Sequence, residues 1–157
     1  MRKGAFALRR GFSLIELVIV VVIIGIIGAI AIPRMSRGAA GASESALVAN
    51  LAQLRGAIDL FQTENGVFPT EANIVAALTT YSDGAGNLNA TRTTTFIFGP
   101  YLRSIPELPV GAAKGNKGIA AAPGPGVGWI YSEATGQIRA NTTATEVDAR
   151  GRRFDTY

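Results

Sequence analysis

Few side chains in this sequence are suited to catalysis or metal binding. The 157 residues include no cysteine and no histidine, which excludes disulfides, thiol nucleophiles and the commonest general base and metal ligand. An enzymatic mechanism would have to use carboxylates, lysine or tyrosine alone, and the sequence shows no convergent carboxylate pair. One carboxylate has an unusual setting, because Glu16 interrupts an otherwise apolar run over residues 12–32. The lack of cysteine, histidine and a carboxylate pair argues against an enzyme, and we expect that no cofactor is required.

The apolar run around Glu16 is long enough to cross a membrane. Its 21 residues would span roughly 32 Å as a helix, against about 30 Å for the hydrocarbon core of a bilayer. A carboxylate in hydrocarbon costs about 2.5–3.5 kcal/mol, so Glu16 is a candidate functional residue. Four basic residues precede the run and favour a cytoplasmic N-terminus: Arg2, Lys3, Arg9 and Arg10.

These four residues also account for the net charge of +4, because the rest of the chain has equal numbers of basic and acidic residues. A basic pI therefore says little about a ligand, and no nucleic-acid partner is expected.

Three interpretations of the N-terminal segment compete. A cleaved secretory signal has an apolar region of about 7–15 residues followed by a small-residue site, whereas this run is longer and ends at Ala31-Ile32-Pro33-Arg34. A plain membrane anchor explains the length but not Glu16. The third interpretation rests on residues 11–16, GFSLIE, behind a short basic leader. This pattern resembles the class III signal of type IV prepilins and type II secretion pseudopilins.

The resemblance implies a processing site and an assembly role. A prepilin peptidase would cut between Gly11 and Phe12, remove residues 1–11 as a leader, and N-methylate Phe12. Glu16 would then be the fifth mature residue, where the family carries its characteristic glutamate, and would set axial register by meeting the Phe12 amine of a neighbouring subunit. In the family the stretch from Gly25 to Pro33 melts or kinks in the assembled fibre, and we expect the same here.

The apolar segment leads into an amphipathic helix. Five apolar residues spaced four, three, four and three apart form one face of the predicted stem, residues 33–64: Leu47, Leu51, Leu54, Ile58 and Phe61. This face predicts packing on a sheet rather than a coiled coil. Asn65-Gly66 is expected to end the helix with a left-handed cap.

Residues 65–157 are expected to form a small α+β head. NGVFPT at residues 65–70 and GPYL at residues 99–102, followed by Ile105-Pro106, resemble segments of G-type major pseudopilins. Thr70 is a candidate N-cap for a short helix over residues 71–79 with three inward residues: Ile74, Val75 and Leu78. Residues 80–95 and 111–128 are predicted to be loops without strands.

A β-hairpin is predicted over residues 128–131 and 137–141, with Trp129 and Tyr131 on one face and a turn ending at Gly136. A further short strand is expected from residues 96–98 or 145–148. The predicted fold class is α+β and pilin-like: residues 12–32 form a membrane or fibre-core helix, and the long helix packs on a small antiparallel sheet.

The C-terminal tail carries three carboxylates: Glu146, Asp148 and Asp155. Major pseudopilins often bind calcium near the C-terminus, and Ca²⁺ requires six to eight oxygen ligands. Because three arginines intervene and the family's loop is not recognisable, a solvated tail of mixed charge is the preferred interpretation and calcium the alternative.

The resemblance implies a major pseudopilin of a type II secretion system, a single-pass inner-membrane protein whose head lies in the periplasm and which polymerises into a periplasmic filament. Its partners would be further copies of itself in a helical filament, prepilin peptidase, minor pseudopilins, membrane lipid, and an assembly platform with its cytoplasmic ATPase. The alternative in the same class is a type IV pilin of a surface fibre used for adhesion, motility or DNA uptake. The absence of cysteine favours the pseudopilin, because most such pilins carry a C-terminal disulfide.

Overall fold

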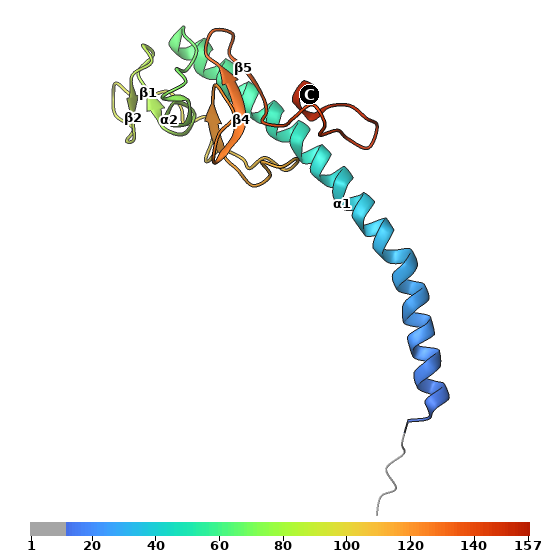
Figure 1. The fold of residues 1–157 in the computed structure, drawn as a ribbon. Helices are drawn as coiled ribbons and strands as arrows, with labels where there is room; N and C mark the ends of the chain where they lie inside the picture. Colours follow the sequence, from blue (N-terminus) through green and yellow to red (C-terminus); the bar gives the residue numbers. More distant parts are fainter. Residues whose placement is uncertain (1–11) are drawn as a thin grey trace, which may run out of the picture. The chain divides into compact units, whose positions relative to one another are not determined.

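The computed structural model describes residues 12–157, of which residues 32–37 are described by backbone alone. The chain divides into two compact units, Met1–Ala39 and Ala40–Tyr157. Helix α1, Leu14–Asn65, begins in the first unit and ends in the second (Figure 1). The predicted leader, residues 1–11, lies outside the described residues.

The second half of α1 is the stem of the head. All five residues of the predicted apolar face are buried, as a helical period of 3.6 requires. The helix ends where the sequence predicts, since Gly66 has φ of +74° and donates its N–H to Gln62 O at 2.8 Å. This is a left-handed cap that glycine adopts without steric cost.

A three-stranded sheet covers the buried face of the stem. It comprises β3, Gly118–Ala120, β4, Val127–Ser132, and β5, Gln137–Ala140, in the order β3-β4-β5. Strands β4 and β5 form the predicted antiparallel hairpin, and Gly136 in its turn has φ of +67°. Strand β3 instead runs parallel to β4, so this sheet is mixed and not wholly antiparallel.

Alternate side chains of the sheet build the core against the stem. Trp129 and Tyr131 lie on one face of β4, opposite Ala140 and Ile138 of β5, and all four are buried together with the stem leucines. Figure 1 shows β4 and β5 beside the second half of α1. The α+β, pilin-like fold class is thus confirmed, with a mixed sheet and a smaller antiparallel one.

The smaller sheet lies in a region predicted to be a loop. Strands β1, Tyr81–Ser82, and β2, Leu88–Asn89, pair antiparallel within residues 80–95. Strands of two residues are too short to show an alternating pattern in a sequence, which is why this region was predicted to be a loop. The expected strand at residues 96–98 is reduced to one bridge between Phe98 and Ser82, and that at residues 145–148 to one between Val147 and Arg153.

The glycine-rich segment, residues 111–128, was also wrongly predicted to lack strands. It contains β3 and the start of β4. A Cβ atom on Gly118 would lie 2.6 Å from Gly126 O, and one on Gly128 would overlap Asn116 O. Gly118 and Gly128 therefore allow two backbone segments to approach closely, which is a common reason for glycine within a strand.

The short helix after the stem is shorter than predicted. Helix α2, Ile74–Thr79, has Asn73 at its N-cap with no side-chain cap hydrogen bond, so Thr70 is not its cap. The prediction that Val75 points inward was wrong, because Val75 is 43 % exposed, whereas Ile74 and Leu78 are buried as expected. The chain ends with a 3₁₀ turn, η1, Phe154–Thr156.

Candidate functional site

The start of α1 carries the predicted processing and assembly residues. Phe12 is 80 % exposed, whereas Gly11, the other side of the predicted cleavage site, lies outside the described residues. The Glu16 carboxylate accepts a hydrogen bond from the Ser13 backbone N–H at 2.8 Å. Leu17 N–H donates to Ser13 O at 3.2 Å, so Ser13 is the N-cap residue directly before the helix.

This arrangement is half of a capping box. In an S-x-x-E sequence the glutamate three residues after the N-cap satisfies the N-cap N–H, which has no partner within the helix. Ser13-Leu14-Ile15-Glu16 has that spacing. The sequence therefore contained a signal for the Ser13–Glu16 contact, which our sequence analysis missed. A carboxylate at a helix N-terminus is also favoured by the helix dipole.

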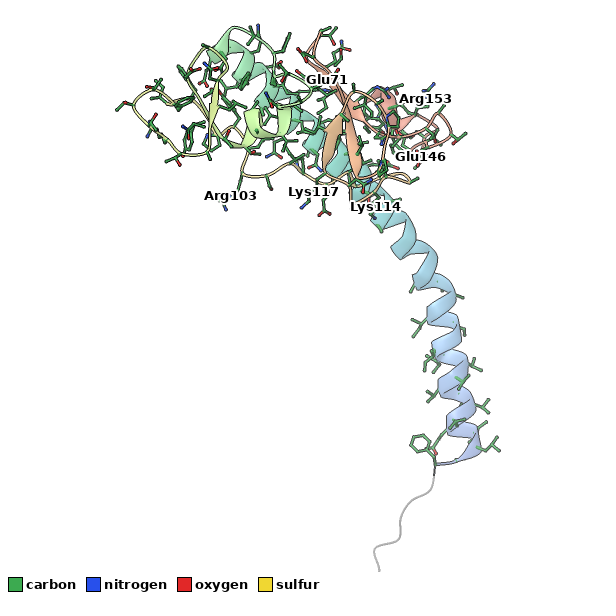
Figure 2. The ribbon with its side chains drawn as sticks, turned by 60° about the vertical axis from the view of Figure 1, so that its left-hand side comes forward. Glu71, Arg103, Lys114, Lys117, Glu146 and Arg153 are labelled. Atoms are coloured by element: carbon green, nitrogen blue, oxygen red, sulfur yellow. The ribbon has the colours of Figure 1, made fainter. Side chains whose placement is uncertain are left out.

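The rest of the first unit is an apolar helix that the described residues leave uncovered. Leu14–Ala31 has a mean hydropathy of 3.1, with none of the segment buried. Apart from Glu16, no side chain of this segment carries a polar atom, and Figure 2 shows carbon side chains projecting along this part of α1. By length and composition it can cross a membrane, and it is the one such helix within residues 12–157.

The predicted helix breakers lie within continuous helix. The backbone is helical through both Gly25 and Pro33. A Cβ atom on Gly25 or Gly28 would meet nothing within 4 Å, so glycine at these positions serves no packing need inside the subunit. Melting or kinking on assembly stays a prediction.

The two head segments that resemble pseudopilins both hold β4 in place. In the first, Pro69 O accepts the Tyr131 hydroxyl at 2.9 Å. In the second, Pro106 O accepts the Trp129 indole N–H at 2.9 Å. Buried aromatic residues with polar atoms need such partners. Each segment thus fixes one aromatic ring of the core.

The second segment also closes the far end of the stem. The Tyr101 hydroxyl donates to Glu64 Oε2 at 2.6 Å, and Asn65 Nδ2 donates to the same hydroxyl at 3.3 Å. Burial and the neighbouring Glu64 raise the pKa of Tyr101 above its usual value. These contacts give the segment a structural role, and no sequence pattern indicated the Glu64–Tyr101 pair.

The three tail carboxylates proposed for calcium are not brought together. Among residues 12–157 no cluster of three or more acidic side chains could hold a metal ion. Glu146 accepts the N–H groups of Thr143 and Ala112, which lower its pKa, Thr143 having the larger effect. Asp155 instead pairs with Arg153, whose Nη2 lies 2.5 Å from Asp155 Oδ2; Figure 2 labels Glu146 and Arg153.

Asp148 is occupied by a third, separate set of donors, from Arg150, Arg152 and Tyr157. A calcium ion would have to displace N–H donors or arginines at each carboxylate, so this donor set does not fit the ion.

Comparison with known proteins supports the interpretation of the N-terminus. Residues 7–32 match the prokaryotic N-terminal methylation motif. No curated protein and no solved structure matches the chain. The matched residues cover the start of α1, with Phe12, Glu16 and the uncovered apolar helix. The chain therefore carries the prepilin-type N-terminal signature of type IV pilin-like proteins, which are membrane-anchored by a single apolar helix.

Proposed function

We propose that this chain is a major pseudopilin, a non-enzymatic structural subunit of a type II secretion pseudopilus. The observation that carries the proposal is the methylation motif at residues 7–32, which extends into a helix whose apolar surface is uncovered from Leu14 to Ala31. Such a surface needs lipid before assembly and other helices after it. The match of NGVFPT and GPYL to pseudopilin segments favours this member of the class over a surface pilin.

The proposed cycle uses the residues at the start of α1. The subunit is stored in the inner membrane with its N-terminus cytoplasmic and its head periplasmic. Prepilin peptidase cuts between Gly11 and Phe12 and methylates Phe12. Glu16 then pairs with the amine of a neighbouring subunit and sets the register as the helix leaves the bilayer.

Other components supply what the chain itself lacks. The assembly platform and its cytoplasmic ATPase provide the energy, minor pseudopilins join the filament, and the pseudopilus drives protein export from the periplasm.

Deletion of the gene distinguishes the two members of the class. If the chain is a pseudopilin, secreted enzymes accumulate in the periplasm of the deletion strain, and expression of the intact chain restores export. Loss of surface fibres with normal secretion would instead identify a type IV pilin and overturn the proposal.

Intact mass of the membrane form tests the processing step. We expect loss of residues 1–11 and a gain of one methyl group. A full-length chain with an intact leader would exclude prepilin processing.

A further inference from the structure

The tail after β5 folds around one buried carboxylate. The Asp148 side chain is 2 % exposed, and its Oδ1 accepts the N–H groups of Arg150 and Arg152, each at 2.8 Å. The Tyr157 hydroxyl donates to Oδ2 at 2.5 Å, and Arg152 Nε lies 3.4 Å from the same oxygen. With the Tyr157 hydrogen bond as the main cause, these donors lower the pKa of Asp148 to about 2. Both oxygens are therefore satisfied by protein groups.

The same turn is fastened to the stem at two points. Near its start, Ala149 N–H donates to Glu44 at 3.0 Å. Near its end, Arg55 Nη2 donates to the backbone oxygen of Tyr157 at 2.5 Å. Glu44 and Arg55 are separated by about 16 Å along the helix. We call residues 148–157 the clasp.

Packing inside the clasp supports these hydrogen bonds. The Arg152 guanidinium carbon lies 3.6 Å from the centre of the Tyr157 ring, a cation–π contact. Phe154 is buried in the core beside it. Arg152 thus neutralises Asp148 and also covers the ring of Tyr157, whose hydroxyl donates to Asp148.

A bound cation could not share this geometry. Calcium requires six to eight oxygen ligands, whereas Asp148 faces two N–H groups, a hydroxyl proton and a guanidinium. An ion placed there would be repelled by Arg152 and would take the acceptor from two partly buried N–H groups, which is costly.

We propose that the clasp holds the tail against the stem without a metal ion. Arg152, Tyr157 and two backbone N–H groups neutralise and bind the Asp148 carboxylate, which is the role that a bound cation would otherwise have. The inference rests on the proposed function in one respect: it predicts a subunit that becomes competent for assembly without calcium. The folding measurement itself concerns the head alone.

The first test compares thermal unfolding of the intact chain in detergent with excess EDTA and with millimolar CaCl₂. Trp129 is the only tryptophan and is fully buried, so its fluorescence reports unfolding of the head. We expect the same midpoint in both conditions. A midpoint that rises by several degrees with calcium and falls with EDTA would overturn the proposal.

The second test removes the centre of the clasp. Asp148→Asn should lower the midpoint by roughly 5 °C or more, with or without calcium, because the variant has lost its charge and one acceptor oxygen. Asp59→Asn is the matched control: Asp59 is exposed on the stem, and its carboxylate makes no hydrogen bond within the described residues, so a shift of about 1 °C or less is expected.

A milder variant covers the case in which Asp148→Asn does not fold. Tyr157→Phe keeps the ring under Arg152 but removes the hydroxyl, and should give a smaller loss that calcium does not restore. An unchanged midpoint in both variants, or calcium stabilisation that Asp148→Asn abolishes, would contradict the clasp. Either result leaves the secretion phenotype of the deletion strain as a separate question, so failure of the clasp and failure of the pseudopilin assignment are distinguishable.

Discussion

Glu16 has two partners to satisfy at different stages. In the isolated subunit its carboxylate accepts the Ser13 N–H, which reduces the cost of placing a carboxylate at the edge of an apolar helix. In the proposed filament it pairs with the amine of a neighbouring Phe12. The first contact needs only an acceptor oxygen, whereas the second needs a negative charge.

Glu16→Gln separates these two roles. Glutamine also completes a capping box, so we expect the variant to insert and to be cleaved and methylated like the wild type. Because its charge is gone, filament assembly should be lost, as it should be in Glu16→Val. The measurements are intact mass for processing and electron microscopy for filaments, with Val20→Leu as a control that keeps the apolar surface. Normal filaments from Glu16→Gln would show that the charge does not set the register.

Tyr131 shows how burial of one hydroxyl couples stability to pH. Burial, with a smaller effect of the nearby Glu133 and Glu71 charges, raises the pKa of Tyr131 to about 12. An unfolded tyrosine titrates near pH 10. The folded state therefore holds this proton more tightly, and the stabilisation is complete below about pH 10 and is lost as pH rises through about 12.

Tyr131→Phe should isolate this contribution. At neutral pH the variant loses the hydrogen bond to Pro69 O, which should cost about 0.5–1.5 kcal/mol of unfolding free energy. The difference between wild type and variant should then shrink between about pH 10 and pH 12. Urea unfolding followed by Trp129 fluorescence measures both effects. Tyr81→Phe is the control, because the Tyr81 hydroxyl makes no hydrogen bond within the described residues; a pH-independent difference for Tyr131→Phe would contradict the raised pKa.

Among the elements, the parallel pair β3–β4 depends on glycine for its spacing. A Cβ atom on Gly128 would overlap backbone, not the end of a flexible side chain. Gly128→Ala should therefore destabilise the head by about 1–3 kcal/mol, the usual cost of overpacking. Gly124→Ala is the matched control, since its Cβ would meet only Val127 Cγ2 at 3.7 Å, and should change stability by about 0.5 kcal/mol or less. Equal effects in urea unfolding would contradict the close approach.

The elements that could be predicted are those with a long periodic pattern. The stem residues from Leu47 to Phe61 repeat over four helical turns, and the β4–β5 hairpin combines alternation with a glycine turn at Gly136. Strands β1, β2 and β3 have two or three residues each, too few for a period to appear. The parallel pairing of β3 with β4 depends on contacts between backbones, which side-chain patterns do not record.

The candidate site was predictable to a similar extent. The residue types and spacing at Phe12 and Glu16 indicated processing and assembly. The motif match supports prepilin-type processing, and the assembly role of Glu16 stays a prediction. The hydrogen bond from Ser13 N–H to Glu16 was not predicted, because the prediction considered the charge of Glu16 and not the S-x-x-E spacing of a capping box. The clasp could not be foreseen, because Tyr157 joins Asp148 through its hydroxyl and the stem through its backbone oxygen. The stem residue that donates to that oxygen, Arg55, lies about a hundred residues earlier in the chain.

At the scale of the whole molecule, one helix meets two different requirements. Its first part exposes apolar side chains, which in the proposed function meet lipid and then other subunits. Its second part packs the head on one face and leaves an outer face exposed. That outer face is not purely polar, because Val48 is 50 % and Leu60 47 % exposed. Between them lies Gly56, where a Cβ atom would meet nothing within 4 Å.

Gly56 therefore has no steric function inside the subunit. Glycine in a helix interior costs about 1 kcal/mol relative to alanine, and Gly56→Ala should raise the unfolding free energy of the head by about 0.4–1 kcal/mol. In the proposed filament the stem helices lie side by side, and a glycine on the outer face allows a neighbouring backbone to approach closely, as small residues do between packed helices. We therefore expect Gly56→Ala to weaken filament assembly while it stabilises the subunit.

This prediction requires two opposite effects of one substitution, a more stable subunit and weaker filament assembly. Head stability is measured by urea unfolding with Trp129 fluorescence, and assembly by the yield of sheared filaments at equal subunit expression. Gln53→Ala is the control: it exchanges another exposed stem residue for the same good helix former, and should leave filament yield unchanged. A variant at Gly56 that is more stable and assembles normally would place the contact between subunits elsewhere on the stem, because a close approach at Gly56 could not accept an added methyl group without a loss of packing.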